Sequence, residues 1–138
     1  MTETAQTTTL QLVRAYYAAF NAGDRAAMLA LLTEDVAHDL NQGARETGTG
    51  AFAAFMQRMD ASYRERLEDI VVMASSDGTH AAAEYVVHGA YIADDADLPA
   101  ARGQRYVLPG GAFFDIRDGR IARVTNYYNL EDWIAQVV

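Results

Sequence analysis

The sequence predicts a single α+β domain in which three helices precede a run of antiparallel strands. Apolar residues recur at helical spacing in the N-terminal part of the chain, and from Leu67 onward the spacing changes to that of strands. The helices and strands come in separate blocks rather than in alternation, which argues against a parallel sheet. The 138 residues, 51% of them hydrophobic, suffice for one sizeable core. A long antiparallel sheet of this kind can curl around the helices and enclose a pocket.

Residues 5–21 are predicted to form an amphipathic helix, because apolar side chains recur there at helical spacing. The Asn-Ala-Gly triplet at 21–23 is expected to end it. Asp24 is expected to cap a second, short helix that runs through Leu32, since its carboxylate can accept a first-turn backbone N–H.

A turn and one short strand are expected between the second helix and the third. Residues 33–35 are predicted to form the turn, residues 36–41 the strand and residues 42–48 a loop. Thr49 is expected to cap the third helix by accepting a backbone N–H. That helix carries an apolar stripe made of Phe52, Phe55, Met56, Met59 and Tyr63.

Four strands are predicted to follow the helices. They cover residues 67–74, 79–92, 104–116 and 121–128. The Ser-Ser-Asp-Gly segment at 75–78 and the Asp118-Gly119 pair are typical of hairpin turns. Pro109-Gly110-Gly111 lies inside the third of these strands, and we expect a bulge or bend there.

Composition excludes several kinds of active site. The sequence has neither Cys nor Lys, which excludes thiolate nucleophiles, Cys-based metal sites and Schiff-base lysines. It also has no G-x-S-x-G nucleophile elbow. Proton chemistry therefore has to come from His38, His80, His88, the carboxylates, tyrosines or bound water. No close His spacing typical of a metal site occurs, so we expect no metal and no cofactor.

The net charge of −8 disfavours nucleic acids and anionic membranes as partners, because binding phosphate needs clustered cations. The longest apolar runs are far shorter than a membrane span, and residues 1–9 lack the features of a signal peptide. We therefore expect a cytoplasmic protein whose partner is a small apolar molecule. We expect one domain over residues 1–138, with a flexible N-terminus at residues 1–6.

Two parts of the sequence resemble a known superfamily. Tyr-Tyr-Ala-Ala-Phe-Asn-Ala-Gly-Asp at 16–24 and Leu-Leu-Thr-Glu-Asp-Val at 31–36 resemble the opening of ketosteroid-isomerase-like proteins. Asp-Gly-Arg-Ile at 118–121 and Asn-Tyr-Tyr-Asn-Leu at 126–130 resemble the last hairpin of SnoaL-like polyketide cyclases and limonene-epoxide hydrolases. The resemblance implies a cone-shaped α+β barrel of the nuclear-transport-factor-2-like superfamily. It also implies a homodimer formed through the outer face of the sheet.

The resemblance carries over only part of the catalytic set. Tyr16 lies where ketosteroid isomerases place their oxyanion-hole tyrosine, and Tyr17 competes with it from a position about 100° around the helix. The base of those enzymes matches Leu40 and their oxyanion-hole Asp matches Gly111, and neither residue can exchange a proton. The water-activating acid of epoxide hydrolases matches Asn126, an amide that can only orient water or a substrate oxygen.

His38 is the first candidate to replace the missing acids. Strand alternation places it on the same face as Leu40, with Asp39 and Asn41 pointing away from that face. Its imidazole titrates with an unperturbed pKa near 6.5. Glu84 and His88 share one face of the strand at 79–92, while Ala, Tyr and Val occupy the other. The sequence leaves open which of these two faces points inward.

The rest of the cavity lining is expected to be apolar and aromatic, which suits a flat or isoprenoid-like molecule. The expected lining comprises Tyr17, Leu40, Phe52, Phe55, Met56, Met59, Val107, Phe113, Val124, Tyr128 and Trp133. The acidic loop at 93–102 is expected to form a solvated rim. Asn129 is expected to cap a last helical turn.

Two functions are compatible with the sequence. The first is a cofactor-independent isomerase, cyclase, dehydratase or hydrolase acting on a small, mostly apolar substrate. In it His38 would shuttle a proton, Tyr16 and Asn126 would hold a substrate oxygen, and Glu84 and His88 would give support. The alternative is a non-catalytic ligand-binding or assembly module. An open cavity in which His38 bonds a second polar group favours the enzyme, and a dry, filled cavity favours the module.

Overall fold

A computed structural model describes residues 4–138 as four helices and one six-stranded sheet. The helices are α1 (Ala5–Ala22), α2 (Arg25–Ala30), α3 (Thr49–Ser62) and α4 (Leu130–Val137). The strands are β1 (Leu32–Asp39), β2 (Arg45–Thr47), β3 (Tyr63–Ala74), β4 (His80–Tyr91), β5 (Gln104–Arg117) and β6 (Arg120–Tyr128). Their order in the sheet is β2-β1-β6-β5-β4-β3. Only the β1–β6 pair is parallel.

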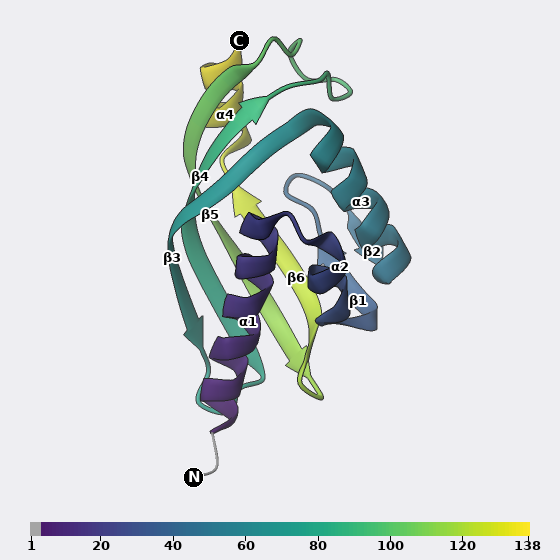
Figure 1. Ribbon diagram of the computed structural model, residues 1–138, viewed down its shortest axis with the longest axis vertical. Coiled ribbons are helices and arrows are strands. Elements are labelled where there is room, and N and C mark those ends of the chain that lie inside the picture. The colour runs from purple at the N-terminus through teal and green to yellow at the C-terminus, as the bar shows by residue number, and fades with distance from the viewer. Residues whose placement is uncertain (1–3) are drawn as a thin grey trace.

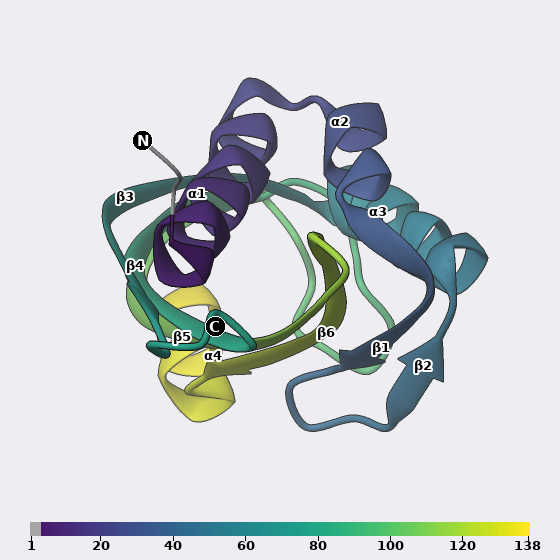
Figure 2. The ribbon, with the colours of Figure 1, turned by 90° about the horizontal axis from the view of Figure 1, so that it is seen from below.

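The sheet is strongly curved, and the N-terminal helices cover its concave face (Figure 1). Figure 2 shows the chain from one end, with the sheet bending from β3 through β4, β5 and β6 to β1. Helices α1, α2 and α3 fill the gap between β3 and β1, so the sheet itself does not close. The predicted fold, a curved sheet wrapped around three N-terminal helices, is confirmed. In the part of the chain that the structure describes, no helix is long and apolar enough to cross a membrane.

The first two helices begin and end where their caps place them. Gly23 ends α1 in a left-handed conformation (φ 72°), and its backbone N–H donates to carbonyls of the last turn. Asp24 caps α2 as predicted, by accepting from the N–H of Ala27. Residues 1–3 of the expected flexible N-terminus lie outside the described residues, and α1 already begins at Ala5.

The segment between α2 and α3 holds more strand than expected. Residues 33–35, predicted as a turn, belong to β1, because pairing with β6 begins at Leu32. Residues 42–48, predicted as a loop, contain β2, which pairs with the end of β1. The predicted cap at Thr49 is wrong, since α3 begins at Thr49 itself and Gly48 occupies the cap position without a side-chain bond.

The long strands match the prediction apart from two local features. Strand β3 begins at Tyr63, four residues before the predicted start, and so continues directly from α3. No bulge occurs at residues 109–111, where pairing with β4 is unbroken and pairing with β6 begins at Gly110. Gly110 instead makes room for a ring, since a Cβ there would lie 2.8 Å from Cε1 of Tyr85. The Asp118-Gly119 turn is confirmed, with both residues at positive φ as a tight hairpin requires.

Bulky side chains pack the two ends of the concave face. At one end Tyr16 and Tyr17 of α1 contact the ring of Phe114 from β5 edge-on, with centroids 5.9 and 6.0 Å away. At the other end Trp133 of α4 lies 5.0 Å from Tyr91 and 5.9 Å from Tyr106. Helix α4 therefore closes that end of the molecule, and Asn129 caps it as predicted by accepting from the N–H of Asp132.

Three residues that are paired across neighbouring strands form a contact that positions a side chain of the site. Glu65 of β3 pairs with Gly89 of β4, which pairs with Tyr106 of β5. A Cβ on Gly89 would lie 2.3–2.5 Å from the outer atoms of the Tyr106 ring. The ring therefore crosses over the glycine, and its hydroxyl donates to Oε2 of Glu65 at 2.6 Å.

Replacing Gly89 with Ala tests this packing. We expect Gly89→Ala to lower the free energy of unfolding by about 1–3 kcal/mol, because a buried ring has to move to admit the methyl group. Gly50→Ala is the matched control, since Gly50 lies in α3 with nothing within 4 Å of its added Cβ. In urea unfolding, the free energy of unfolding of this control should equal that of the wild type or slightly exceed it. Equal stabilities of the two variants would contradict the crossing.

Candidate active site

A cavity of about 430 Å³ lies between the N-terminal helices and the concave face of the sheet. Most of the side chains expected to line it do so, and they come from α1, β1, α3, β6 and α4. They are Tyr16, Tyr17, His38, Leu40, Phe52, Phe55, Met56, Met59, Asn126, Tyr128 and Trp133. The chamber is therefore walled mainly by rings and thioethers, a lining that suits a flat apolar molecule.

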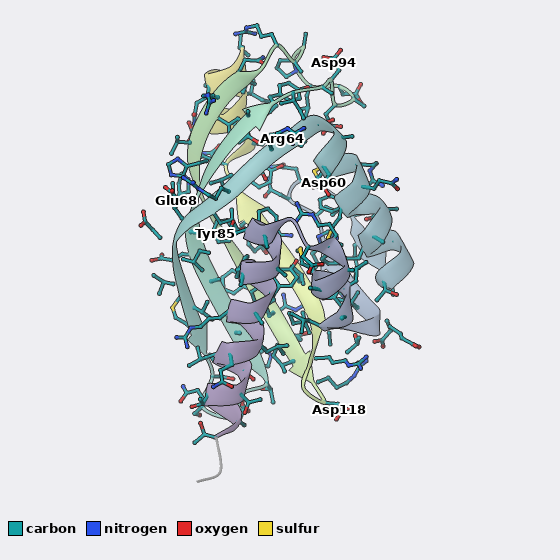
Figure 3. All side chains as sticks on the ribbon, in the orientation of Figure 1. Asp60, Arg64, Glu68, Tyr85, Asp94 and Asp118 are labelled. Atoms are coloured by element: carbon teal, nitrogen blue, oxygen red, sulfur yellow. The ribbon has the colours of Figure 1, made fainter. Side chains whose placement is uncertain are left out.

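Glu84 and His88 do not reach the cavity. The inner face of β4 is the one that carries Tyr85 and Val87, both of which line the chamber. On the outer face, Nε2 of His88 lies 2.8 Å from Oε2 of Glu68 on the neighbouring strand. Figure 3 shows Glu68 at the edge of the sheet, away from the helices. The supporting catalytic role considered for Glu84 and His88 therefore has no geometric basis.

Three of the expected apolar lining residues lie elsewhere. Val107 and Phe113 are 51% and 48% exposed on the outer face of β5, so the prediction that they point inward is wrong. The inner face carries the residues next to them in sequence, Tyr106 and Leu108 among them. Val124 is fully buried, but it lies in the packed core rather than in the cavity wall.

His38 projects from β1 into a tight aromatic slot. Its side chain is 2% exposed, it stacks on Phe52 at 4.3 Å between centroids, and it meets Phe55 edge-on at 4.6 Å. Burial lowers the pKa of the imidazole below its usual value, against the opposing effect of the negative charges of Glu46 and Asp39. The ring is therefore neutral at pH 7 and able to accept a proton.

The two ring nitrogens of His38 have different surroundings. Nε2 lies 3.2 Å from Nδ2 of Asn126, so an amide N–H that donates there makes Nε2 the acceptor and places the ring proton on Nδ1. Among residues 4–138, Nδ1 has no hydrogen-bond partner, and neither has the buried Oε1 of Glu46. His38 and Glu46 are directly paired across β1 and β2, so their side chains share one face of the sheet. The pairing sets the Glu46 carboxylate close enough to the imidazole for its charge to raise the pKa of His38.

The neighbouring Asp39 has a structural role instead. Its carboxylate accepts from Nε and Nη2 of Arg45 at 2.6 and 3.0 Å and from the hydroxyl of Thr125 at 2.6 Å. The bonds from Arg45 lower the pKa of Asp39 to about 2, so it stays ionised. Asp39 thereby joins β1 to β2 and β6. Asn41, expected to point away from the cavity, lines it instead, since β1 ends at Asp39.

Both tyrosines of α1 line the cavity and are also part of the core. Their rings lie 5.3 Å apart at a steep angle, and the ring of Tyr17 lies 5.5 Å from that of Tyr85. Tyr85 is beside the C-terminal half of α1 in Figure 3. Burial raises the pKa of Tyr16 and of Tyr17, so both phenols keep their protons and can donate hydrogen bonds.

Glu65 is a cavity carboxyl that the sequence analysis missed. It lies on the inner face of β3, between Tyr63 and Leu67, and all three line the chamber. The desolvation that comes with its position raises the pKa of this carboxyl, while the bond from Tyr106 and the charge of Arg25 lower it. The signal was the alternation Tyr-x-Glu-x-Leu, which would have placed Glu65 inward had the strand been started at Tyr63.

The mouth of the cavity holds further polar groups whose bonds are already made. Arg25 of α2 forms two bonds with the carboxylate of Asp60, at 3.0 and 2.7 Å. The Tyr63 hydroxyl donates to Asp95 at 2.7 Å, so the acidic loop contributes to the cavity wall as well as to the rim. Within residues 4–138, no three His, Asp or Glu side chains are grouped as a metal ion would need.

Comparison with known proteins indicates the family to which this chain is related. A profile of the SnoaL-like domain matches residues 13–124. A protein from Pseudomonas putida KT2440, provisionally named a polyketide cyclase, is 64% identical, with a TM-score of 0.93 over 99% of this chain and 100% of that one. A protein of Xanthomonas campestris with the same provisional name is 65% identical, with a TM-score of 0.95 over 98% and 100% of the two chains.

More distant structures share the fold. A protein from Kribbella flavida, provisionally named a ketosteroid isomerase, is 27% identical, with a TM-score of 0.65 over 91% of this chain and 81% of that one. No curated protein matches the chain.

Titration of His38 followed by NMR tests the electrostatics of the site. We expect its pKa to lie below 6.5 and to fall further in Glu46→Gln, because the carboxylate stabilises the imidazolium. Glu84→Gln is the control, since Glu84 is on the exposed outer face. A His38 pKa in Glu46→Gln that equals or exceeds the wild-type value would show that Glu46 does not act on the ring.

Proposed function

The chain belongs to the SnoaL-like domain family, and we propose that its cavity catalyses proton transfer at a carbon next to a carbonyl group. The observation that carries the proposal is the neutral, buried imidazole of His38, which meets the amide of Asn126 inside an open, ring-lined chamber. A base has to be unprotonated and within reach of the substrate, and the lowered pKa of His38 and its place in the cavity lining support both conditions. The substrate class is a small, flat, mostly apolar ketone.

The residues divide the reaction between them. The Asn126 N–H turns from Nε2 of His38 to the substrate oxygen, which frees the lone pair of Nε2. Nε2 then removes the proton from the carbon, and the electron pair of the C–H bond moves onto the carbonyl oxygen to form an enolate. Asn126 and Tyr16 supply N–H and O–H donors for that oxygen, which gains negative charge in the transition state. The imidazolium then returns the proton, either to another carbon of the enolate or to an alkoxide that forms when the enolate carbon attacks a second carbonyl.

The second of these routes is a cyclisation, and the relatives favour it. The proteins 64% and 65% identical to this chain are both provisionally named polyketide cyclases. Ring closure by carbon–carbon bond formation begins with the proton abstraction assigned to His38. Leu40 stands where the ketosteroid isomerase base is expected, so in this proposal the base comes from two residues earlier in the chain, at His38, which lines the same cavity.

Deuterium exchange tests the proton transfer directly. In D₂O, the wild-type protein should accelerate exchange of the protons next to the carbonyl of 2-tetralone, as followed by NMR. His38→Ala should lower this acceleration by about 100-fold or more, the range for loss of a general base. Glu84→Gln should exchange at the wild-type rate, because its side chain is remote from the cavity. Wild-type exchange in His38→Ala would remove His38 from the mechanism.

The pH dependence of the same reaction has a defined sign. Because burial lowers the pKa of His38, exchange by the protein should be constant above the usual pKa of a histidine and should be lost as pH falls through the lowered pKa. A rate that keeps rising between pH 7 and pH 9 would indicate a different base. Binding of 2-tetralone with no acceleration of exchange would favour the alternative, a module that binds its ligand without transforming it.

A further inference from the structure

We propose that Glu65 forms a second hydrogen-bonding pole of the cavity and binds a hydroxyl group of the substrate. The inference rests on the proposed function, since it takes the carbonyl end of the same molecule to lie at His38 and Asn126. It narrows the substrate class to a hydroxylated, ring-containing ketone, such as a phenolic one.

The Glu65 carboxyl is held in place by a hydrogen bond from a buried tyrosine. Its Oε2 accepts the 2.6 Å bond from the hydroxyl of Tyr106, whose ring reaches it only by crossing Gly89. The Tyr106 ring is buried and is packed at its edge by Trp133, 5.9 Å away between centroids. The orientation of the carboxyl is therefore fixed before a ligand arrives, which lowers the entropic cost of binding one.

The Glu65 carboxyl also has hydrogen-bond acceptor sites that are not used and that face the chamber. A carboxylate has about four acceptor sites, and Tyr106 uses one of them. The Glu65 side chain keeps substantial accessible surface although it points to the inner side of the sheet, and it belongs to the cavity wall. A carboxyl placed among rings is costly unless donors satisfy it, so a substrate O–H is the partner that this position favours.

The position of Glu65 relative to His38 explains why one molecule would touch both. β3 and β1 lie on opposite sides of the curved sheet, with β4, β5 and β6 between them (Figure 2). The two residues therefore line the same cavity from strands at opposite ends of the sheet order, and rings such as Phe52, Tyr17 and Tyr85 belong to the same lining. A flat frame with a carbonyl at one end and a hydroxyl at the other matches this arrangement.

Two probes that differ in one donor test the proposal. They are 6-hydroxy-2-naphthaldehyde and 6-methoxy-2-naphthaldehyde, titrated against the full chain by fluorescence. The wild type should bind the hydroxy probe about tenfold or more tightly than the methoxy probe, the difference expected for a hydrogen bond to a charged group. Glu65→Leu should bring the two affinities to within about threefold, and Glu65→Gln should give an intermediate ratio.

The controls separate this proposal from a loss of folding and from the proposed function. Glu84→Gln should keep the wild-type ratio, and the methoxy probe should bind to Glu65→Leu about as well as to the wild type if the cavity is intact. Should Glu65→Leu fail to fold, the ratio in Glu65→Gln decides. The proposed function is tested separately, by the exchange of 2-tetralone in His38→Ala, a variant in which Glu65 is unchanged. A wild type that does not prefer the hydroxy probe, or an unchanged ratio in the Glu65 variants, would overturn the proposal.

Discussion

The inner face of one curved sheet has to serve both as the core of the domain and as the wall of a cavity. Packing concentrates at the two ends of that face, where Phe114 meets the tyrosines of α1 and where Trp133 meets Tyr91 and Tyr106. The middle holds the cavity of about 430 Å³, and the three N-terminal helices bridge the gap between β3 and β1 over it. His38, Asn126 and Glu65 all line this cavity, so the proposed chemistry depends on it.

Inside the hollow, polar side chains have their orientation set by a neighbouring residue. The imidazole of His38 packs between two phenylalanine rings and is hydrogen-bonded to Asn126. Glu65 accepts a hydrogen bond from a tyrosine whose ring crosses a glycine. Low polarity around both groups favours their neutral forms, which lowers the pKa of a histidine and raises that of a carboxyl. The same environment therefore leaves His38 able to accept a proton and favours hydrogen-bond donors next to the Glu65 carboxyl.

Sequence patterns determined much of this arrangement, and their failures have physical causes. The resemblance placed Leu40 at the cavity, and strand alternation then placed His38 inward and Asp39 outward. For β4 the pattern left open which face points inward, because a face made of Ala83, Tyr85 and Val87 can lie on either side of a sheet. The inner face of β5 was misassigned for the same reason, as exposed Val107 and Phe113 alternate with buried Tyr106 and Leu108. Glu65 was missed because α3 runs into β3 without a turn to mark the boundary. The expected homodimer stays a prediction.

The central claim is that a hollow chamber holds a substrate between the His38–Asn126 pair and Glu65. A crystal structure of the full chain with 6-hydroxy-2-naphthaldehyde tests it most directly. The account predicts the probe inside the chamber, with its carbonyl oxygen within hydrogen-bond distance of Asn126 and its hydroxyl on the carboxyl of Glu65. A probe bound only on the outer face of the sheet, or side chains collapsed into the space beside His38, would contradict it.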